Sequence, residues 1–93
     1  MRLIRWTTEA SDQLVAAVRH IQEDKLGAAR NAAETVIERI EQLATFPDIG
    51  RPGEVAGTRE LVSAPFVIVY RSTEEIFEIL HIWHGAQDWR SRN

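Results

Sequence analysis

Two histidines, an aspartate and two tryptophans fall within residues 81–89, HIWHGAQDW, and side chains of these types can do chemistry. Histidine transfers protons near neutral pH and is a common metal ligand. If a strand runs from Ile76 to Trp83, alternation places His81 and His84 on opposite faces unless the strand ends or bulges between them. No convincing third ligand accompanies them, so we expect no metal ion and no cofactor.

Strict alternation along this strand makes a further prediction about its two faces. One face would carry Phe77, Ile79, His81 and Trp83. The other face would carry Ile76, Glu78, Leu80, Ile82 and His84.

Two interpretations of the cluster stay open. In the structural one, Trp83 and Trp89 close a small core, and a short helical turn follows from Gly85 to Arg90. In the catalytic one, the histidines act together with two arginines on neighbouring strands, Arg59 and Arg71, which are expected on one sheet face where they can bind a phosphate or a carboxylate. The candidate residues of such a nuclease site are Arg59, Arg71, His81, His84 and Asp88.

The elements that must position these residues begin with a strand over Leu3–Trp6. A helix should follow with Thr8 as its N-cap, because Ala10, Leu14, Val18 and Ile21 form an apolar stripe at helical spacing. A second amphipathic helix should run from about Leu26 to Ala44. A loop rich in proline and glycine should extend from Phe46 to about Gly57.

Three strands complete the predicted fold, over Arg59–Ser63, Phe66–Arg71 and Ile76–Trp83. Their short connections predict antiparallel hairpins. The expected architecture is an α+β domain over residues 1–93, in which a helical hairpin packs on one face of a small antiparallel sheet in the order β-α-α-β-β-β.

Composition narrows the class of function. The 93-residue chain has no cysteine and a net charge of −3. It lacks the strongly basic balance of a typical nucleic-acid-binding protein, although ten of its eleven basic residues are arginine. We identify no signal peptide and no stretch long enough to cross a membrane, and therefore expect a cytoplasmic protein.

An ordered succession of motifs runs through the second half of the chain. The segments are LATFPDIGR (43–51), GTREL (57–61), VIVYR (67–71) and ILHIWHGAQDW (79–89). Their order and spacing resemble the RelE/ParE superfamily of toxins from bacterial type II toxin–antitoxin modules, and in particular its ParE-like, plasmid-stabilisation branch. The resemblance implies the RelE/ParE-like fold and a growth-inhibiting toxin neutralised by a cognate antitoxin.

The resemblance implies two competing activities. RelE-like members cut mRNA on the ribosome, whereas ParE-like members poison DNA gyrase. Val67 and Ala86 stand where RelE-like nucleases carry arginines, which favours a non-hydrolytic toxin that binds gyrase. A ribosome-dependent endoribonuclease using histidine and arginine is the alternative, and a non-toxic homologue that only binds the antitoxin is another.

A partner surface is predicted from the apolar side chains on both faces of the central strand, since a sheet covered on one side needs only one apolar face. The alternative is that the C-terminal segment with Trp89 covers the second face. The candidates for antitoxin or target binding are Trp6, Arg59, Val67, Val69, Arg71, Trp83 and Trp89. We expect a toxin–antitoxin hetero-oligomer that meets DNA only through the antitoxin and does not bind membranes.

Overall fold

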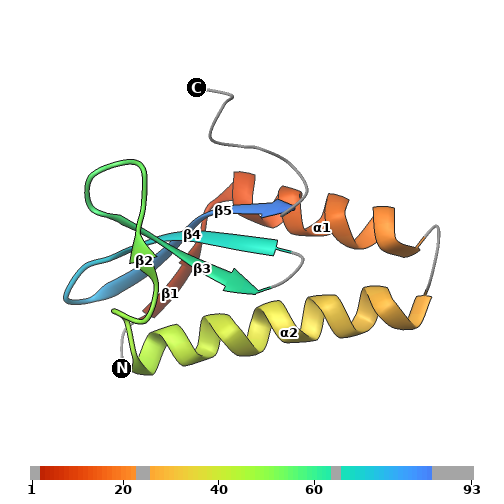
Figure 1. Cartoon of the computed structure of the whole chain (residues 1–93), viewed down its shortest axis with the longest axis horizontal. Coiled ribbons are helices and arrows are strands. Elements are labelled where there is room, and N and C mark those ends of the chain that lie inside the picture. Colours follow the sequence, from red (N-terminus) through yellow and green to blue (C-terminus); the bar gives the residue numbers. More distant parts are fainter. Residues whose placement is uncertain (1–2, 23–25, 64–65, 85–93) are drawn as a thin grey trace.

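The computed structural model describes residues 3–22, 26–63 and 66–84, with only the backbone for residues 20–22, 26–29 and 84. The elements, in chain order, are β1 (Leu3–Trp6), α1 (Thr8–Gln22), α2 (Leu26–Thr45), β2 (Arg51–Pro52), β3 (Thr58–Ser63), β4 (Phe66–Ser72) and β5 (Ile76–His84). The two helices form a hairpin against the strands (Figure 1). The predicted α+β fold is therefore confirmed.

The five strands form one mixed sheet in the order β1-β5-β4-β3-β2. Strands β3, β4 and β5 are antiparallel neighbours, as their short connections predict. Strand β1 lies parallel to β5, and the two-residue strand β2, which falls within the predicted loop, pairs with β3. The prediction of a wholly antiparallel sheet was therefore wrong for β1, and the sheet is one strand wider than the sequence predicts.

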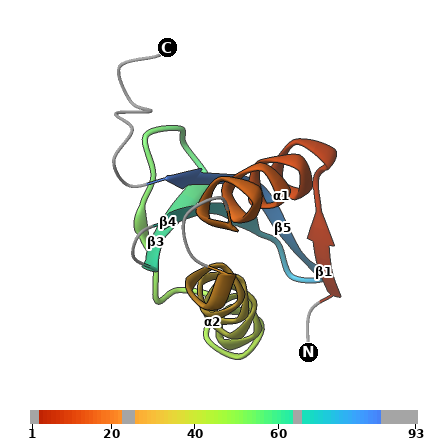
Figure 2. The same cartoon turned by 90° about the vertical axis from the view of Figure 1, so that its right-hand side faces the viewer.

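The core lies between the helical hairpin and one face of the sheet. The apolar stripe of α2 supplies Val36, Ile40 and Leu43, and α1 supplies Ala10. The sheet contributes Leu61, Phe66, Ile68, Tyr70, Phe77, Ile79 and Ile82. Figure 2 looks roughly along the helices and shows α1 and α2 next to each other. Burial of these side chains is the main source of stability, at about 1.5–3 kcal/mol for each large one.

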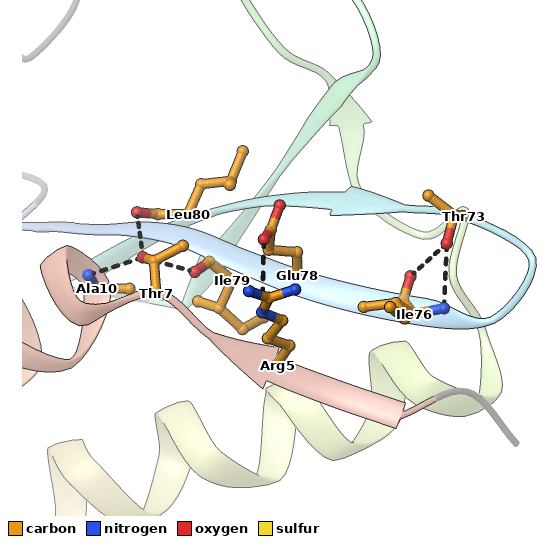
Figure 3. Close-up of polar contacts among 8 residues, drawn as sticks. All are labelled: Arg5, Thr7, Ala10, Thr73, Ile76, Glu78, Ile79 and Leu80. Atoms are coloured by element: carbon orange, nitrogen blue, oxygen red, sulfur yellow. Dashed lines mark hydrogen bonds and ion pairs between the residues drawn. The ribbon is translucent and has the colours of Figure 1, made fainter.

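Thr7, rather than Thr8, caps helix α1. Its Oγ1 accepts a hydrogen bond from the backbone N–H of Ala10 at 3.1 Å, the geometry of an N-cap. The same oxygen lies 3.0 Å from the carbonyl oxygen of Ile79 and 3.1 Å from that of Leu80, so its hydroxyl donates to β5 (Figure 3). The expected cap at Thr8 was wrong by one residue. Thr7 is the residue that both caps the helix and donates a hydrogen bond to the strand.

Substitution of Thr7 by alanine should lower the free energy of unfolding by about 2 kcal/mol, since both the cap and the bond to β5 are lost. Thr8→Ala is the matched control, because Thr8 is exposed within the first turn, and it should change stability by less than about 0.5 kcal/mol. Urea denaturation measures both values. Equal effects of the two substitutions would contradict the assignment of Thr7 as the cap.

A β-bulge at Leu80 divides β5 into two halves. Val69 of β4 pairs with His81, but the next residue, Tyr70, pairs with Ile79, so Leu80 is skipped. Ile79 and Ile82 consequently both face the core. The predicted strict alternation, which put Phe77 and Ile79 on the same face as His81 and Trp83, was wrong for this reason.

Tyr70 anchors the loop between α2 and β2. Its hydroxyl donates to the carbonyl oxygen of Pro47 at 2.9 Å and accepts from the N–H of Gly50 at 3.0 Å. The side chain is fully buried, and this burial raises the pKa of the Tyr70 phenol above its usual value. These bonds fix the conformation of the FPDIG segment (46–50), which connects the end of α2 to β2.

Candidate binding cleft on the open face of the sheet

The sheet face turned away from the helices, called the open face below, contains a cleft of about 380 Å³. Its central residues are Thr58 and Glu60 of β3, Val69 and Arg71 of β4, and Leu80, His81 and Trp83 of β5. Thr7 and Glu9 at the start of α1 and Glu54 and Val55 before β3 complete the lining. The bulge at Leu80 is what turns His81 and Trp83 to this face, beside Val69 and Val67 in the strand register.

Glu60 is the most deeply buried charged group of the cleft. Its side chain is 1% exposed, and its Oε1 accepts from both Nε and Nη2 of Arg51 at 3.0 Å. Arg51 sits directly opposite Glu60 in the β2–β3 pairing, so the short strand β2 brings the guanidinium to the carboxylate. Two charge-assisted contacts to this one oxygen offset part of the cost of burying the charge.

His81 contacts both an acid and an aromatic ring. Its Nδ1 lies 3.5 Å from Oε1 of Glu9, which stands in the first turn of α1. Its ring stacks on that of Trp83, with centroids 5.1 Å apart and planes at 26°. Trp83 lines the cleft instead of joining the core cluster, so the expectation that it closes the core was wrong.

Arg71 is exposed at the cleft and forms no ion pair with any other described residue. Three glutamates accompany this one arginine in the lining. One of these glutamates, Glu60, is paired with Arg51, so the lining is mixed in charge and holds no cluster of cationic side chains among the described residues.

Arg59 does not reach the cleft. It pairs with Tyr70 in the β3–β4 register, whereas Arg71 pairs with Thr58, so the two arginines lie on opposite faces. Arg59 Nη1 donates to the carbonyl oxygen of Gly50 at 2.7 Å, and its Nε lies 3.7 Å from Oδ1 of Asp48. The predicted pair of arginines on one face was wrong, and Arg59 instead holds the loop before β2.

The remaining candidates from the sequence are distributed over several environments. Val67 and Val69 lie on the open face but are 9% and 6% exposed, so they offer little surface of their own. Trp6 is partly buried and packs against the core. Asp88 and Trp89, with the predicted turn over residues 85–90, lie outside the described residues, as does the side chain of His84.

The sequence interpretation missed the glutamates of the cleft. Glu9, Glu54 and Glu60 are not among the site residues predicted from the sequence. One signal was available for Glu60, since it alternates with Arg59 and Leu61 in a predicted strand and so had to face the side opposite them. Among the described residues, no three His, Asp or Glu side chains are grouped closely enough to hold a metal ion.

Neither helix within the described part of the chain has the length and apolar character needed to span a bilayer.

Comparisons with known proteins agree with this fold. Residues 4–89 match the family described as the ParE toxin of the type II toxin–antitoxin system parDE. The curated protein "Putative toxin Y4kP" of Sinorhizobium fredii is 38% identical over 88 residues, which cover 92% of this chain and 91% of that protein. The sequence match thus extends over almost the full length of both chains.

Two solved structures are similar in fold. The chromosomal ParDE system of P. aeruginosa superposes with a TM-score of 0.78 at 28% identity, covering 90% of this chain and 96% of that one. The DinJ–YafQ complex of E. coli gives a TM-score of 0.58 at 14% identity, covering 96% and 99%, a likeness of fold alone. The match over residues 4–89 places this chain in the family of ParE toxins of type II toxin–antitoxin systems.

Proposed function

We propose that this toxin arrests growth by binding a cellular target, DNA gyrase, without cleaving RNA, and that a cognate antitoxin neutralises it. The observation that supports binding over cleavage is the composition of the cleft, whose lining holds the single arginine Arg71 beside three glutamates, one of them paired with Arg51. Cleavage of a phosphodiester requires cationic groups around the scissile phosphate to stabilise the developing charge. A cytoplasmic location belongs to the same proposal, because gyrase and ribosomes both work there.

One contact favours ribosome-dependent RNA cleavage as a second candidate. His81 lies 3.5 Å from Glu9 and lines the same cleft as Arg71. A histidine beside a carboxylate is a suitable general base for a 2′-hydroxyl, and one arginine would serve the phosphate. This candidate predicts that activity depends on both His81 and Arg71.

The experiment is to produce the chain without its antitoxin and follow growth, chromosomal breaks and mRNA integrity together. We expect growth arrest with gyrase-dependent DNA breaks and intact mRNA. In a purified system, the toxin should inhibit supercoiling by gyrase. His81→Ala and Arg71→Ala separate the candidates, with Glu38→Ala on the exposed side of α2 as the matched control.

Codon-linked mRNA cuts that fall by about 10²-fold or more in His81→Ala, but not in Glu38→Ala, would replace the gyrase proposal with RNA cleavage. A chain that binds its antitoxin but leaves growth unchanged would identify a non-toxic homologue and overturn both.

A further inference from the structure

A row of charged side chains crosses three strands of the open face beside the cleft. Arg5 of β1 and Arg71 of β4 are both in register with Glu78 of β5, one on each side of it. Side chains of residues paired across neighbouring strands point to the same face of a sheet. Because Arg71 lines the cleft on the open face, Glu78 and Arg5 lie on that face as well. Arg5 therefore shares a face with Arg71, the position that the sequence prediction gave to Arg59.

Both guanidinium groups of this row are available to a ligand. Arg71 is exposed and forms no ion pair with any other described residue. The side chain of Arg5 is 69% exposed, and its Nε lies 4.0 Å from Oε2 of Glu78, beyond hydrogen-bond distance (Figure 3). An exposed contact of this length contributes little stability, so a ligand can replace it at low cost.

Glu78 determines the charge that a ligand would meet. It stands between two cations, offsets one of them and reduces their mutual repulsion, so the row carries a single net positive charge. Neighbouring strands lie about 4.8 Å apart, which puts the Cα atoms of Arg5 and Arg71 about 10 Å apart, close enough for both long side chains to reach one group. One carboxylate between the two guanidinium groups would complete an alternating network of two cations and two anions.

Apolar side chains next to the row indicate a polypeptide ligand rather than a nucleic acid. Leu3 and Ile76 are paired on the same two strands, two residues before Arg5 and Glu78, and so lie on the same face. Leu3 is 74% exposed and offers apolar surface beside the charges. Nucleic-acid binding depends on several cationic contacts to successive phosphates, which a single net positive charge does not supply.

We infer that the row Arg5–Glu78–Arg71 binds a carboxylate of the antitoxin, whose neighbouring apolar residue packs on Leu3. The antitoxin is the partner expected of a toxin in this family, and the inference rests on the proposed function in taking it as the neutralising partner. Both guanidinium groups donate charge-assisted hydrogen bonds to the one carboxylate. The site thus selects an antitoxin segment that carries aspartate or glutamate next to an apolar residue.

The first test measures the rate at which the antitoxin dissociates from Arg5→Gln, from Arg71→Gln and from the double variant. Arg30→Gln is the matched control, because it removes the same charge from an exposed arginine of α2, away from the open face. We expect dissociation about tenfold faster in each single variant and unchanged in the control. Because both arginines hold one carboxylate, the double variant should exceed either single variant by less than about threefold.

Single variants that dissociate at the rate of Arg30→Gln would overturn the inference. Losses that multiply in the double variant would also overturn it, since they would indicate two separate contacts. Arg5 and Arg71 are exposed, so their substitution should leave folding intact, and a urea denaturation curve of each variant checks this.

The second test locates the carboxylate by replacing each aspartate and glutamate of the antitoxin in turn with its amide. One replacement should speed dissociation about tenfold from the wild-type toxin but less than about twofold from the double variant of Arg5 and Arg71. Leu3→Asn should speed dissociation several-fold. An antitoxin in which no carboxylate depends on the two arginines in this way would contradict the site.

Gyrase and growth assays on the same variants separate this inference from the proposed function. If the wild type inhibits gyrase and the antitoxin reverses this, but the arginine variants release the antitoxin at the wild-type rate, the docking site is wrong and the function stands. If the variants release the antitoxin faster but the wild type leaves gyrase active, the gyrase proposal fails and the site stands. Variants that lose gyrase inhibition or RNA binding, with unchanged antitoxin binding, would assign the row to the target and overturn the inference.

Discussion

Replacing Gly50 with alanine should lower the free energy of unfolding by about 3 kcal/mol. A Cβ at this position would stand 2.5 Å from the Tyr70 hydroxyl oxygen and 2.9 Å from the carbonyl oxygen of Glu60. The strand β3 backbone cannot move aside without disturbing the sheet. The tyrosine must therefore shift, which breaks its bonds to Gly50 and Pro47.

Gly57→Ala provides the matched control, because Gly57 has open space around its Cβ position and a positive φ of 85°. Gly57→Ala should lower the free energy of unfolding by about 1–2 kcal/mol, through backbone conformation alone. Gly57→Asn should recover part of this loss. Urea denaturation of the three variants gives the comparison. If Gly50→Ala proved as stable as the wild type, the tight packing of the FPDIG segment on Tyr70 would be refuted.

Removal of Arg51 should have the second large effect, a loss of about 3 kcal/mol in Arg51→Ala. Glu60 is 1% exposed, and the substitution takes away the guanidinium that is bound to its Oε1. We place the cost at the lower end of the range for buried pairs, because Arg51 itself is 52% exposed. The double substitution Arg51→Met with Glu60→Met should recover most of the stability, since it removes the buried charge as well.

The pair Arg5–Glu78 is the internal comparison. Its atoms are 4.0 Å apart and Arg5 is 69% exposed, so Arg5→Ala should cost less than about 0.5 kcal/mol. Thermal or chemical denaturation of the three variants and the wild type tests the difference between the two pairs. A double variant no more stable than Arg51→Ala alone would show that burial of the Glu60 charge is not the source of the loss.

The elements were largely predictable because their signals are local. The stripes of α1 and α2 and the proline at position 47 define two helices and a loop, and α2 ends at Thr45, one residue after its predicted end. The strands β3 and β4 follow from apolar runs with short connections. Strand β2 was not predictable, since two residues, Arg51 and Pro52, carry no periodicity and pair only because β3 lies beside them.

The cleft was less predictable because it depends on contacts between distant segments. The bulge at Leu80 has no local sequence signal. At the bulge, the Leu80 carbonyl accepts a hydrogen bond from the hydroxyl of Thr7, which lies 73 residues earlier in the chain. Arg59 is likewise predicted from the sequence to share a sheet face with Arg71, whereas its guanidinium donates a hydrogen bond to the Gly50 carbonyl. These hydrogen bonds decide which charged residues share a face of the sheet. The spacing of residues in the sequence does not reveal them.

The skipped residue in β5 also bears on how the family can diversify. Phe77 and Ile79 before the bulge are completely buried, and changes there disturb folding. His81 and Trp83 after it face outward, on the same continuous strand. Mutation can therefore change the surface presented by the second half of the strand while the buried side chains of the first half stay constant.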